Sequence, residues 1–320
     1  MNCLFNSFLA GEIQAYIDFK CALGYSVLSY EKHLRSFDEF CCKHYPEEKT
    51  ITEQIVSHWT EKRPTENTNG HIRRMIALKG FLDFLKLKFE DSYVIPSGMI
   101  GQYKPCMPYL YSDEELESFF LAADTLPVHP AALYREETAP VIFRMLYCCG
   151  MRPQEPLRLK CSDLDLRTGT VYIADSKNHK DRVIIMSEDM RSLCVKYNIR
   201  MEQHMPCRTY FFERPDGRPY DISWLQNTFH LCIKRSALSF NTNGRRPRVY
   251  DFRHNFATRV IQKWISQGID TAVMLPRLSA YMGHAKLKDT AYYIHLVPEH
   301  FKKNRMNEWS EIPEVPVYED

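Results

Sequence analysis

Four arginines lie within twelve residues of this 320-residue sequence, in the segment Asn243-Gly-Arg-Arg-Pro-Arg-Val-Tyr-Asp-Phe-Arg-His254. A site that binds phosphate needs such a local density of positive charge, whatever the net charge of the whole chain. The same cluster could equally be a solvated surface turn. Other residues suited to phosphate chemistry, at meaningful spacings, are needed to decide between the two.

Four further segments carry such residues, and each is a weak signal alone. They are Tyr147-Cys-Cys-Gly-Met-Arg152-Pro-Gln-Glu155-Pro-Leu157, followed by Leu159 and Ser162-Asp-Leu-Asp-Leu166; Ser176-Lys177-Asn-His-Lys180-Asp-Arg182; Met282-Gly-His284; and Thr290-Ala-Tyr-Tyr293-Ile-His295. With Tyr250-Asp-Phe-Arg253-His254-Asn-Phe-Ala-Thr258, they make five segments in a fixed order.

These five segments resemble the motifs of the tyrosine recombinases, the phage integrase family. In chain order they match its first arginine box, its β-hairpin lysine segment, its His-x-x-Arg box, its Leu-Gly-His box and its tyrosine box. The spacings are 101 residues from Arg152 to Arg253, 31 from Arg253 to His284 and 9 from His284 to Tyr293. The resemblance covers about residues 110–305 and depends on this order and spacing.

The resemblance implies a reaction in which DNA is cut and rejoined through a 3′-phosphotyrosine, without metal or cofactor. Such a reaction needs a nucleophile, neutralisation of the charge on the phosphate, and a proton for the leaving 5′-oxygen. By resemblance Tyr293 is the nucleophile, Arg152 and Arg253 hold the phosphate, His284 donates a hydrogen bond to it, and Lys177 is the general acid. The resemblance thus implies a site-specific recombinase or integrase, typical of a mobile genetic element.

Several neighbouring residues compete for these roles. Lys180 competes with Lys177 in a loop that is about one residue longer than the commonest form. Tyr292 competes with Tyr293, but adjacent helical side chains point about 100° apart, and the Thr-x-x-Tyr spacing selects Tyr293. We expect Glu155 to hold Arg152 in place. His254 is interpreted as a packing histidine and left out of the site, and His295 either positions or caps the tyrosine segment.

Tyr250 is the one clear departure from the family pattern, because a histidine usually stands at this position. A phenol can donate a hydrogen bond to a phosphate oxygen, so Tyr250 is kept among the catalytic candidates. It cannot act as a base near neutral pH as an imidazole can. The general-base role usually offered for this position is therefore open here.

Hydrophobic periodicity predicts a mainly α-helical chain with a small antiparallel β-sheet. The first part is helical, with Ile13, Tyr16, Ile17 and Cys21 on one face of the first helix. We expect a helical, SAM-like core-binding domain over residues 1–92, a linker over 93–111, a catalytic domain over 112–305 and an acidic tail over 306–320. Ser112 and Glu115 form a predicted capping box, and residues 170–174 and 182–186 a predicted hairpin.

By resemblance the two domains close as a C-shaped clamp around double-stranded DNA at specific recombination sites. The expected contacts with the DNA backbone are Lys62, Arg63, Arg73 and Arg74 in the first domain and Arg245, Arg246 and Arg248 in the second. Family members act as homotetramers on two paired sites and exchange a C-terminal segment, for which residues 297–301 are the candidate here. Accessory proteins are a possible further class of partner.

Composition sets broad limits on the class of protein. The net charge is only +2, with 44% hydrophobic residues, and no apolar run is long enough for a transmembrane helix. The eleven cysteines include no C-x-x-C pair, and the N-terminus does not resemble an export signal. We therefore expect a cytoplasmic protein with free thiols and no membrane partner.

Three other functions compete with a recombinase. A non-catalytic DNA-binding regulator from the same family is expected to have lost a catalytic position, and Tyr250 is the one anomaly. A type IB topoisomerase shares the chemistry, but the helical N-terminal domain and the short spacing from His284 to Tyr293 argue against it. A metal-dependent nuclease would need a cluster of carboxylates to hold the metal, and no such cluster accompanies the arginines in this sequence.

Overall fold

A computed structural model of the chain describes residues 5–25, 28–90, 92–104, 107–176, 180–236 and 246–297. The chain divides into two compact units, Met1–Cys106 and Met107–Asp320. The predicted fold class is confirmed, because the described residues are mainly helical and form a small antiparallel sheet. Within the described part of the chain, no helix has both the length and the apolar character that a membrane span requires.

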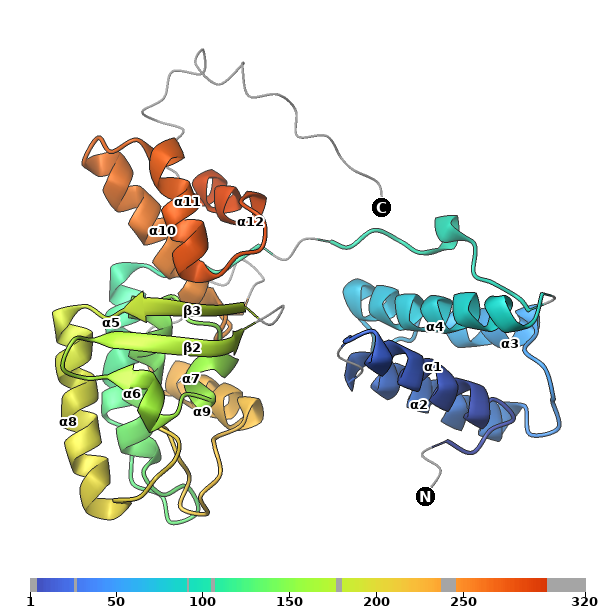
Figure 1. Cartoon of the computed structure of the whole chain (residues 1–320), viewed down its shortest axis with the longest axis horizontal. Coiled ribbons are helices and arrows are strands. Elements are labelled where there is room, and N and C mark those ends of the chain that lie inside the picture. The colour runs from blue at the N-terminus through green and yellow to red at the C-terminus, as the bar shows by residue number, and fades with distance from the viewer. Residues whose placement is uncertain are drawn as a thin grey trace. The chain divides into compact units, whose positions relative to one another are not determined.

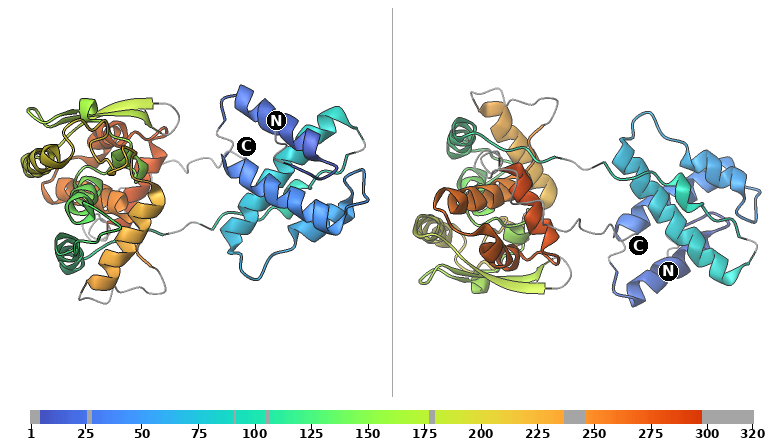
Figure 2. Two further views of the ribbon diagram at one scale, coloured as in Figure 1. Left: turned by 90° about the horizontal axis from the view of Figure 1, so that it is seen from below. Right: turned by 90° about the horizontal axis from the view of Figure 1, so that it is seen from above.

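The first unit is a small helical domain. Its helices are α1 (Ala10–Ala22), α2 (Leu28–His44), α3 (Glu53–Thr60) and α4 (Thr68–Lys88), followed by the short η1 (Ser97–Met99). Helix α4 packs against both α1 and α2 (Figure 2). Side chains begin two of the helices, since Thr52 accepts a hydrogen bond from the Ile55 N–H and Asn67 from the Gly70 N–H.

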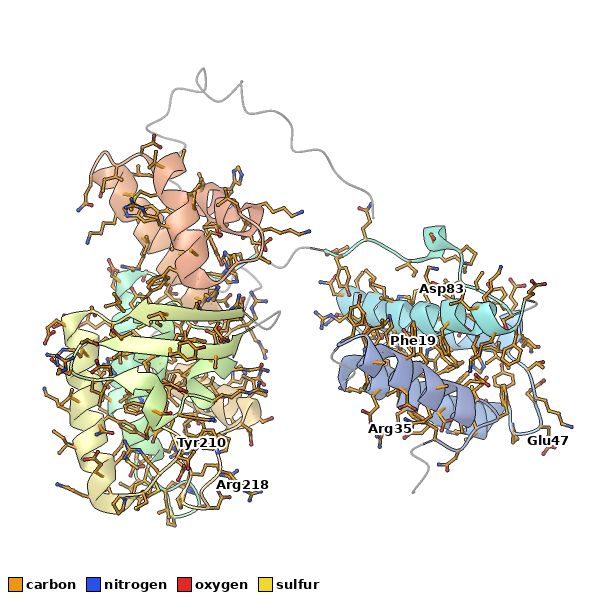
Figure 3. The ribbon with its side chains drawn as sticks, in the orientation of Figure 1. Phe19, Arg35, Glu47, Asp83, Tyr210 and Arg218 are labelled. Carbon is orange, nitrogen blue, oxygen red and sulfur yellow. The ribbon has the colours of Figure 1, made fainter. Side chains whose placement is uncertain are left out.

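Burial in α1 follows the predicted helical stripe with one exception. Ile13, Tyr16 and Ile17 are buried as predicted, but Cys21 is exposed. Cys21 lies in the last turn of α1, where the described residues from Asp18 on are all at least partly exposed, so the stripe ends one turn earlier than predicted. Two surface residues labelled in Figure 3 form ion pairs within their own helices, Arg35 with Glu31 in α2 and Asp83 with Lys79 in α4.

In the second unit, helices cover one face of a three-stranded antiparallel sheet, and the other face is exposed (Figure 1 and Figure 2). Its elements are α5 (Asp113–Asp124), α6 (Arg135–Cys148), α7 (Gln154–Leu157), η2 (Cys161–Asp163), β1 (Leu164–Asp165), β2 (Thr170–Ser176), β3 (Lys180–Ile185), α8 (Glu188–His204), α9 (Ile222–Arg235), α10 (Asp251–Ser266), α11 (Thr271–Met282), α12 (Lys288–Ala291) and η3 (Tyr292–Leu296). The predicted hairpin is confirmed as β2 and β3, in the register Val171–Ile184 and Ile173–Arg182. The predicted capping box is also confirmed, because Ser112 and Glu115 each accept a hydrogen bond from the other's backbone N–H.

Two buried clusters hold this unit together. The larger is centred on aromatic rings from four helices, Phe119, Phe143, Phe229 and Phe252. The smaller joins α10 and α11 to the end of the described chain, and its members include Ile261, Leu278, Met282 and Tyr293. Helices α10, α11 and α12 gather at one end of the unit, where α11 also lies against β3 (Figure 1). Four of the predicted site residues, Arg152, Arg253, His284 and Tyr293, converge at that end.

Candidate active site

Arg152 follows a tight turn at the end of α6. Gly150 in this turn has φ +59°, and a Cβ added there would lie 2.3 Å from Cδ1 of Phe256. Any other residue would therefore meet both an unfavourable backbone conformation and a clash with the ring. The turn that leads from α6 into α7 therefore requires a glycine at position 150, within the first arginine box.

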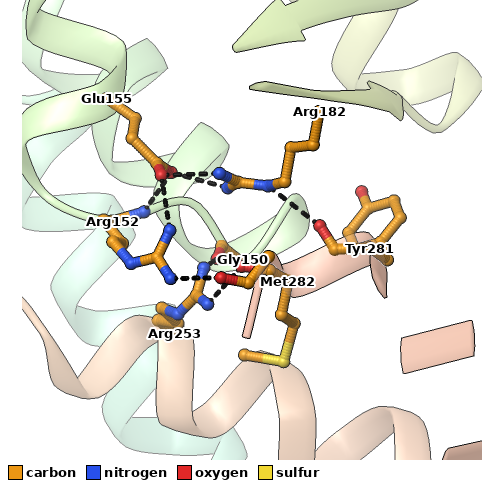
Figure 4. A network of polar contacts seen from close by, with 8 residues as sticks. Gly150, Arg152, Glu155, Arg182, Arg253, Tyr281 and Met282 are labelled. Atoms are coloured by element: carbon orange, nitrogen blue, oxygen red, sulfur yellow. Dashed lines mark hydrogen bonds and ion pairs between the residues drawn. The ribbon is translucent and has the colours of Figure 1, made fainter. Parts of the chain in front are cut away.

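Glu155 of α7 binds two arginines at once (Figure 4). Its carboxylate accepts hydrogen bonds from Arg152 at both the backbone N–H (2.6 Å) and Nη1 (3.0 Å). Its two oxygens also accept from Nη1 and Nη2 of Arg182 in β3, each at 2.7 Å. Burial alone raises the pKa of Glu155, but the hydrogen bonds and charge of Arg182, with the Arg152 N–H, outweigh it and lower the pKa.

Arg152 and Arg253 meet at the C-terminal end of α11. Nη2 of Arg152 donates to the carbonyl oxygen of Gly283 at 2.7 Å, and Nη2 of Arg253 donates to that of Met282 at 2.5 Å. Arg253 also donates through Nη1 to the carbonyl oxygen of Gly150 at 2.5 Å. Arg253 is 0% exposed, and its burial, with the charge of Arg152 nearby, lowers its pKa to about 10.

His284 begins the segment that follows α11. Gly283 ends the helix at φ +66°, and a Cβ there would lie 2.9 Å from Cδ of Arg182, so a glycine fits this position. Nδ1 of His284 lies 2.7 Å from the hydroxyl oxygen of Thr290, which is fully buried. Burial, with the charges of Arg253 and Arg152, lowers the pKa of His284 to about 3, so the imidazole is neutral.

Tyr293 lies in η3, inside the smaller apolar cluster, and is 2% exposed. Its ring stacks against that of His284, with centroids 6.1 Å apart and planes at 21°. Its hydroxyl lies 3.2 Å from Nδ1 of His254, within hydrogen-bonding distance. Burial raises the pKa of Tyr293 to about 12, although the positive charge of Arg253 acts in the opposite direction.

Tyr250 lies at the start of α10 and is 39% exposed. Its ring centroid is 5.1 Å from that of His254, which lies one turn along the same helix. Arg248 is bound to the buried carboxylate of Asp251 through its backbone N–H (2.8 Å) and Nη2 (2.9 Å), while Arg246 is exposed. Lys177 and Arg245 lie outside the described residues.

The predicted DNA contacts of the first unit differ from one another. Lys62, Arg63 and Arg73 are exposed, but Arg74 is only 2% exposed. Arg74 donates to the carboxylate of Glu66 and to the backbone carbonyls of Trp59 and Glu61, so its side chain joins α3 to α4. Arg74 is therefore not placed for the predicted contact with the DNA backbone, because its donors are taken up inside the domain.

Comparisons with known proteins decide the family. The model of the phage integrase family matches residues 111–300, more than half of the chain. The chain belongs to the phage integrase family, that of the tyrosine recombinases. This confirms the family expected from the five motifs.

Similar proteins match this chain along most of its length. A putative integrase/recombinase of Sinorhizobium fredii is 26% identical over 91% of this chain and 94% of its own length. The tyrosine recombinase XerD of Rickettsia bellii is 22% identical over 87% and 90%. The fold resembles XerH site-specific recombinase bound to a difH substrate (TM-score 0.64, 22% identity, 86% of this chain and 77% of that one). It also resembles a lambda integrase tetramer bound to a Holliday junction (TM-score 0.62, 15% identity, 89% and 76%).

Three residues of this integrase-family site were missed or left without a role by the sequence analysis. Arg182 shares the carboxylate of Glu155, and His254 contacts Tyr293. Asn255 is buried and joins α10 to the start of the unit: its Oδ1 accepts from the Tyr111 N–H and its Nδ2 donates to the Tyr109 carbonyl, both at 2.9 Å. Among the described residues, no group of three or more His, Cys, Asp or Glu side chains is arranged to hold a metal ion.

Proposed function

We propose that the chain is a site-specific DNA recombinase of a mobile genetic element that breaks and rejoins strands through a 3′-phosphotyrosine at Tyr293. The observation that carries this proposal is the convergence of four side chains from separate segments. Arg152 and Arg253 donate to the adjacent carbonyls of Gly283 and Met282, directly before His284, and the ring of His284 stacks on Tyr293. A phosphodiester placed among them would face two cations, a hydrogen-bond donor and a nucleophile.

The two arginines suit the charge that develops on the phosphate. A guanidinium stays charged and offers several donors in a fixed plane, which matches phosphate oxygens. Nε of Arg253 is buried and has no acceptor among the described residues, so a phosphate oxygen that reached it would supply the missing partner. Removing one such donor from a reacting oxyanion typically costs about 3–4 kcal/mol of transition-state stabilisation.

Two side chains supply protons in this proposal. His284 is neutral, so it donates to the phosphate only if Nε2 carries its proton. The Thr290 hydroxyl fixes that tautomer when it donates to Nδ1. Lys177, which follows the last residue of β2, protonates the leaving 5′-oxygen, and Tyr250 donates a further hydrogen bond to the phosphate.

The nucleophile needs both access and activation. With a pKa of about 12, only about one Tyr293 side chain in 10⁵ is a phenolate at pH 7. Its 2% exposure also means that η3 must shift before the hydroxyl can reach a phosphorus atom. We propose that binding of DNA brings about this shift. A bound phosphodiester would interact directly with Arg152 and Arg253, whose side chains donate to the carbonyls just before His284.

The proposed DNA contacts join basic side chains to the DNA backbone, and those of them that lie within the described residues are exposed. Lys62, Arg63 and Arg73 supply them in the first unit, and Arg245, Arg246 and Arg248 in the second; Arg74 is excluded by its burial. Each phosphate contact contributes about −0.9 to the slope of log affinity against log salt on duplex DNA. These contacts fix position, and they leave the choice of sequence to groups that reach the bases.

The proposed working assembly is a homotetramer on two paired recombination sites, with accessory proteins as possible further partners. Support comes from the fold shared with a lambda integrase tetramer on a Holliday junction. The candidate for a segment exchanged between subunits is 297–301, of which residues 298–301 lie outside the described residues. A DNA substrate of this kind places the protein in the cytoplasm.

The test is covalent trapping on a nicked duplex. A binding site is selected from a random duplex library, nicked beside the cleavage position so that the freed end diffuses away, and incubated with protein in EDTA and without nucleotide. We expect wild-type protein and Tyr292→Phe to migrate with the DNA on a denaturing gel, and Tyr293→Phe to bind DNA but not to be trapped. Trapping of Tyr293→Phe but not of Tyr292→Phe, or trapping only after magnesium is added, contradicts the proposal.

A further inference from the structure

We propose that His254 takes the proton from Tyr293 during strand cleavage and is therefore a catalytic residue of this chain. The inference rests on the proposed function, because it adds a proton acceptor to the reaction in which Tyr293 attacks DNA. It assigns to position 254 the base that the tyrosine at position 250 cannot provide.

The geometry brings the imidazole to the nucleophile directly. Nδ1 of His254 lies 3.2 Å from the hydroxyl oxygen of Tyr293, and the two ring centroids are 5.6 Å apart at 54°. His254 lies four residues after Tyr250, so both side chains project from the same face of α10. A histidine one turn along the helix thus occupies the neighbourhood of the position where the family usually carries one.

Two features of the surrounding structure fix this contact. Asn255, the residue after His254, hydrogen-bonds to the backbone of Tyr109 and Tyr111, and this limits rotation or sliding of α10. On the other side Tyr293 is packed into the smaller apolar cluster with Ile261 and Leu278. In the absence of DNA, both partners of the hydrogen bond are therefore held by groups that do not take part in it, and the proposal requires His254 to stay within reach of Tyr293 when η3 shifts.

His254 is in the protonation state that an acceptor requires. Burial, together with the positive charges of Arg248 and Arg253, lowers its pKa to about 4, although the charge of Asp251 acts in the opposite direction, so the ring is neutral at pH 7. With the proton on Nε2, the lone pair of Nδ1 accepts the hydrogen bond of the phenol. The titratable and charged groups around the ring are Arg248, Tyr250, Asp251, Arg253, His284 and Tyr293.

An approaching phosphodiester changes this balance in favour of proton transfer. Its negative charge favours an imidazolium over a neutral ring, so the pKa of His254 rises as DNA binds. The proton of the Tyr293 hydroxyl then moves to Nδ1 while the phenolic oxygen forms a bond to phosphorus. The bond from phosphorus to the 5′-oxygen breaks, and that oxygen takes a proton from the general acid. In religation the same proton returns from His254 to Tyr293.

A packing histidine is the competing interpretation, and one substitution separates the two. In His254→Asn the side-chain oxygen takes the place of Nδ1, so it can still accept a hydrogen bond but cannot take a proton near neutral pH. We expect single-turnover cleavage by His254→Asn and by His254→Ala to fall on the order of 100-fold. His204→Asn is the matched control, because His204 stacks on Tyr134 at the end of α8, and its cleavage rate should not change.

The pH dependence gives a second readout that a structural role does not produce. Without an internal base, solution hydroxide must remove the proton, so the rate of His254→Asn should rise about tenfold per pH unit between pH 7 and 9. Wild-type protein should show a shallower slope. Equal slopes, or a wild-type rate in His254→Asn with a wild-type melting temperature, would overturn the inference. If wild-type protein itself is never trapped on DNA, the proposed function fails, and the role of His254 fails with it.

Discussion

Glu155 and Arg182 form a two-point ion pair across the site, with both oxygens of the carboxylate bound to both terminal nitrogens of the guanidinium at 2.7 Å. The side chains are only 8% and 7% exposed, respectively. Arg182 also donates through Nε to the carbonyl of Tyr281. The pair therefore connects α7, β3 and the end of α11, and it positions the hairpin that leads to Lys177.

Breaking this pair should cost stability because it leaves a buried charge uncompensated. We expect Arg182→Ala to lower the free energy of unfolding by about 3–5 kcal/mol, measured by urea denaturation. Arg167→Ala is the control, because Arg167 is 87% exposed and its pairing with Asp165 is worth little. A change in Arg182→Ala no larger than that in Arg167→Ala would contradict the tight pairing.

The same pair predicts how stability depends on pH. The folded pKa of Glu155 is lowered, so its contribution is fully present above the unfolded value, about 4.3, and is lost as pH falls through the folded pKa. The difference in unfolding free energy between wild type and Glu155→Gln should therefore be constant from pH 7 to pH 5 and shrink below about pH 4. Urea titrations at pH 7, 5 and 3 measure it. A difference that grows on acidification would reverse the assigned sign.

Arg152 and Arg253, the two arginines proposed to bind the phosphate, should differ in what they do for the fold. Arg253 satisfies two buried carbonyls, those of Gly150 and Met282, which a single ammonium cannot bridge in the same way. We expect Arg253→Lys to lower both stability, by about 1–3 kcal/mol, and cleavage. Arg152 is partly exposed, so Arg152→Lys should lower cleavage on the order of 100-fold with little change in melting temperature. Equal melting temperatures for the two variants would contradict this distinction.

Thr290 gives a test of the His284 tautomer. Its buried hydroxyl lies 2.7 Å from Nδ1, and Thr290→Val removes that hydroxyl while keeping the shape of the side chain. With no donor at Nδ1, the proton can move there and leave Nε2 unable to donate to the phosphate. We expect cleavage to fall about tenfold, which corresponds to one neutral hydrogen bond. Thr290→Ser, which keeps a hydroxyl, should recover most of the rate; a Ser variant as slow as Val would count against the tautomer argument.

The sequence was sufficient for the parts of the fold that depend on local pattern. The β-branched runs predicted β2 and β3, and the spacing of Ser112 and Glu115 predicted the capping box that begins α5. The family motifs named Arg152, Arg253, His284 and Tyr293, which the structure brings together. Two of the glycines in those motifs also have a physical reason, since a Cβ at Gly150 or Gly283 would meet a neighbouring side chain.

Contacts between distant segments could not be predicted, because they depend on how the elements pack. Arg73 and Arg74 are chemically alike and adjacent, yet adjacent helical positions point about 100° apart, and only Arg74 faces the inside of its domain. Asn255 bonds to backbone groups 144 and 146 residues away, which no local pattern reveals. His254 was left out of the predicted site because a histidine at this position is more often a packing residue in the family. Its contact with Tyr293 depends on the packing of η3 against α10, which the sequence does not reveal.

Tyr250 is the position where the chain departs from its family, and its exposure decides what its replacement should do. At 39% exposed it is not a buried packing residue, so neither Tyr250→Phe nor Tyr250→His should lower the melting temperature by more than a degree or two, roughly the effect of a typical surface substitution. If its hydroxyl donates to the scissile phosphate, Tyr250→Phe should lose about 1–2 kcal/mol of transition-state stabilisation, on the order of ten- to thirty-fold in single-turnover cleavage.

Tyr250→His extends the test to the proton acceptor, because it places an imidazole one turn before His254 on the same face of α10. This substitution should be tolerated in the wild-type background. In the His254→Asn background it should recover part of the lost cleavage, since a base is again within reach of Tyr293. An unchanged rate in Tyr250→Phe would remove the residue from the site, and a failure of Tyr250→His to help His254→Asn would mean that a base on this turn cannot reach the nucleophile.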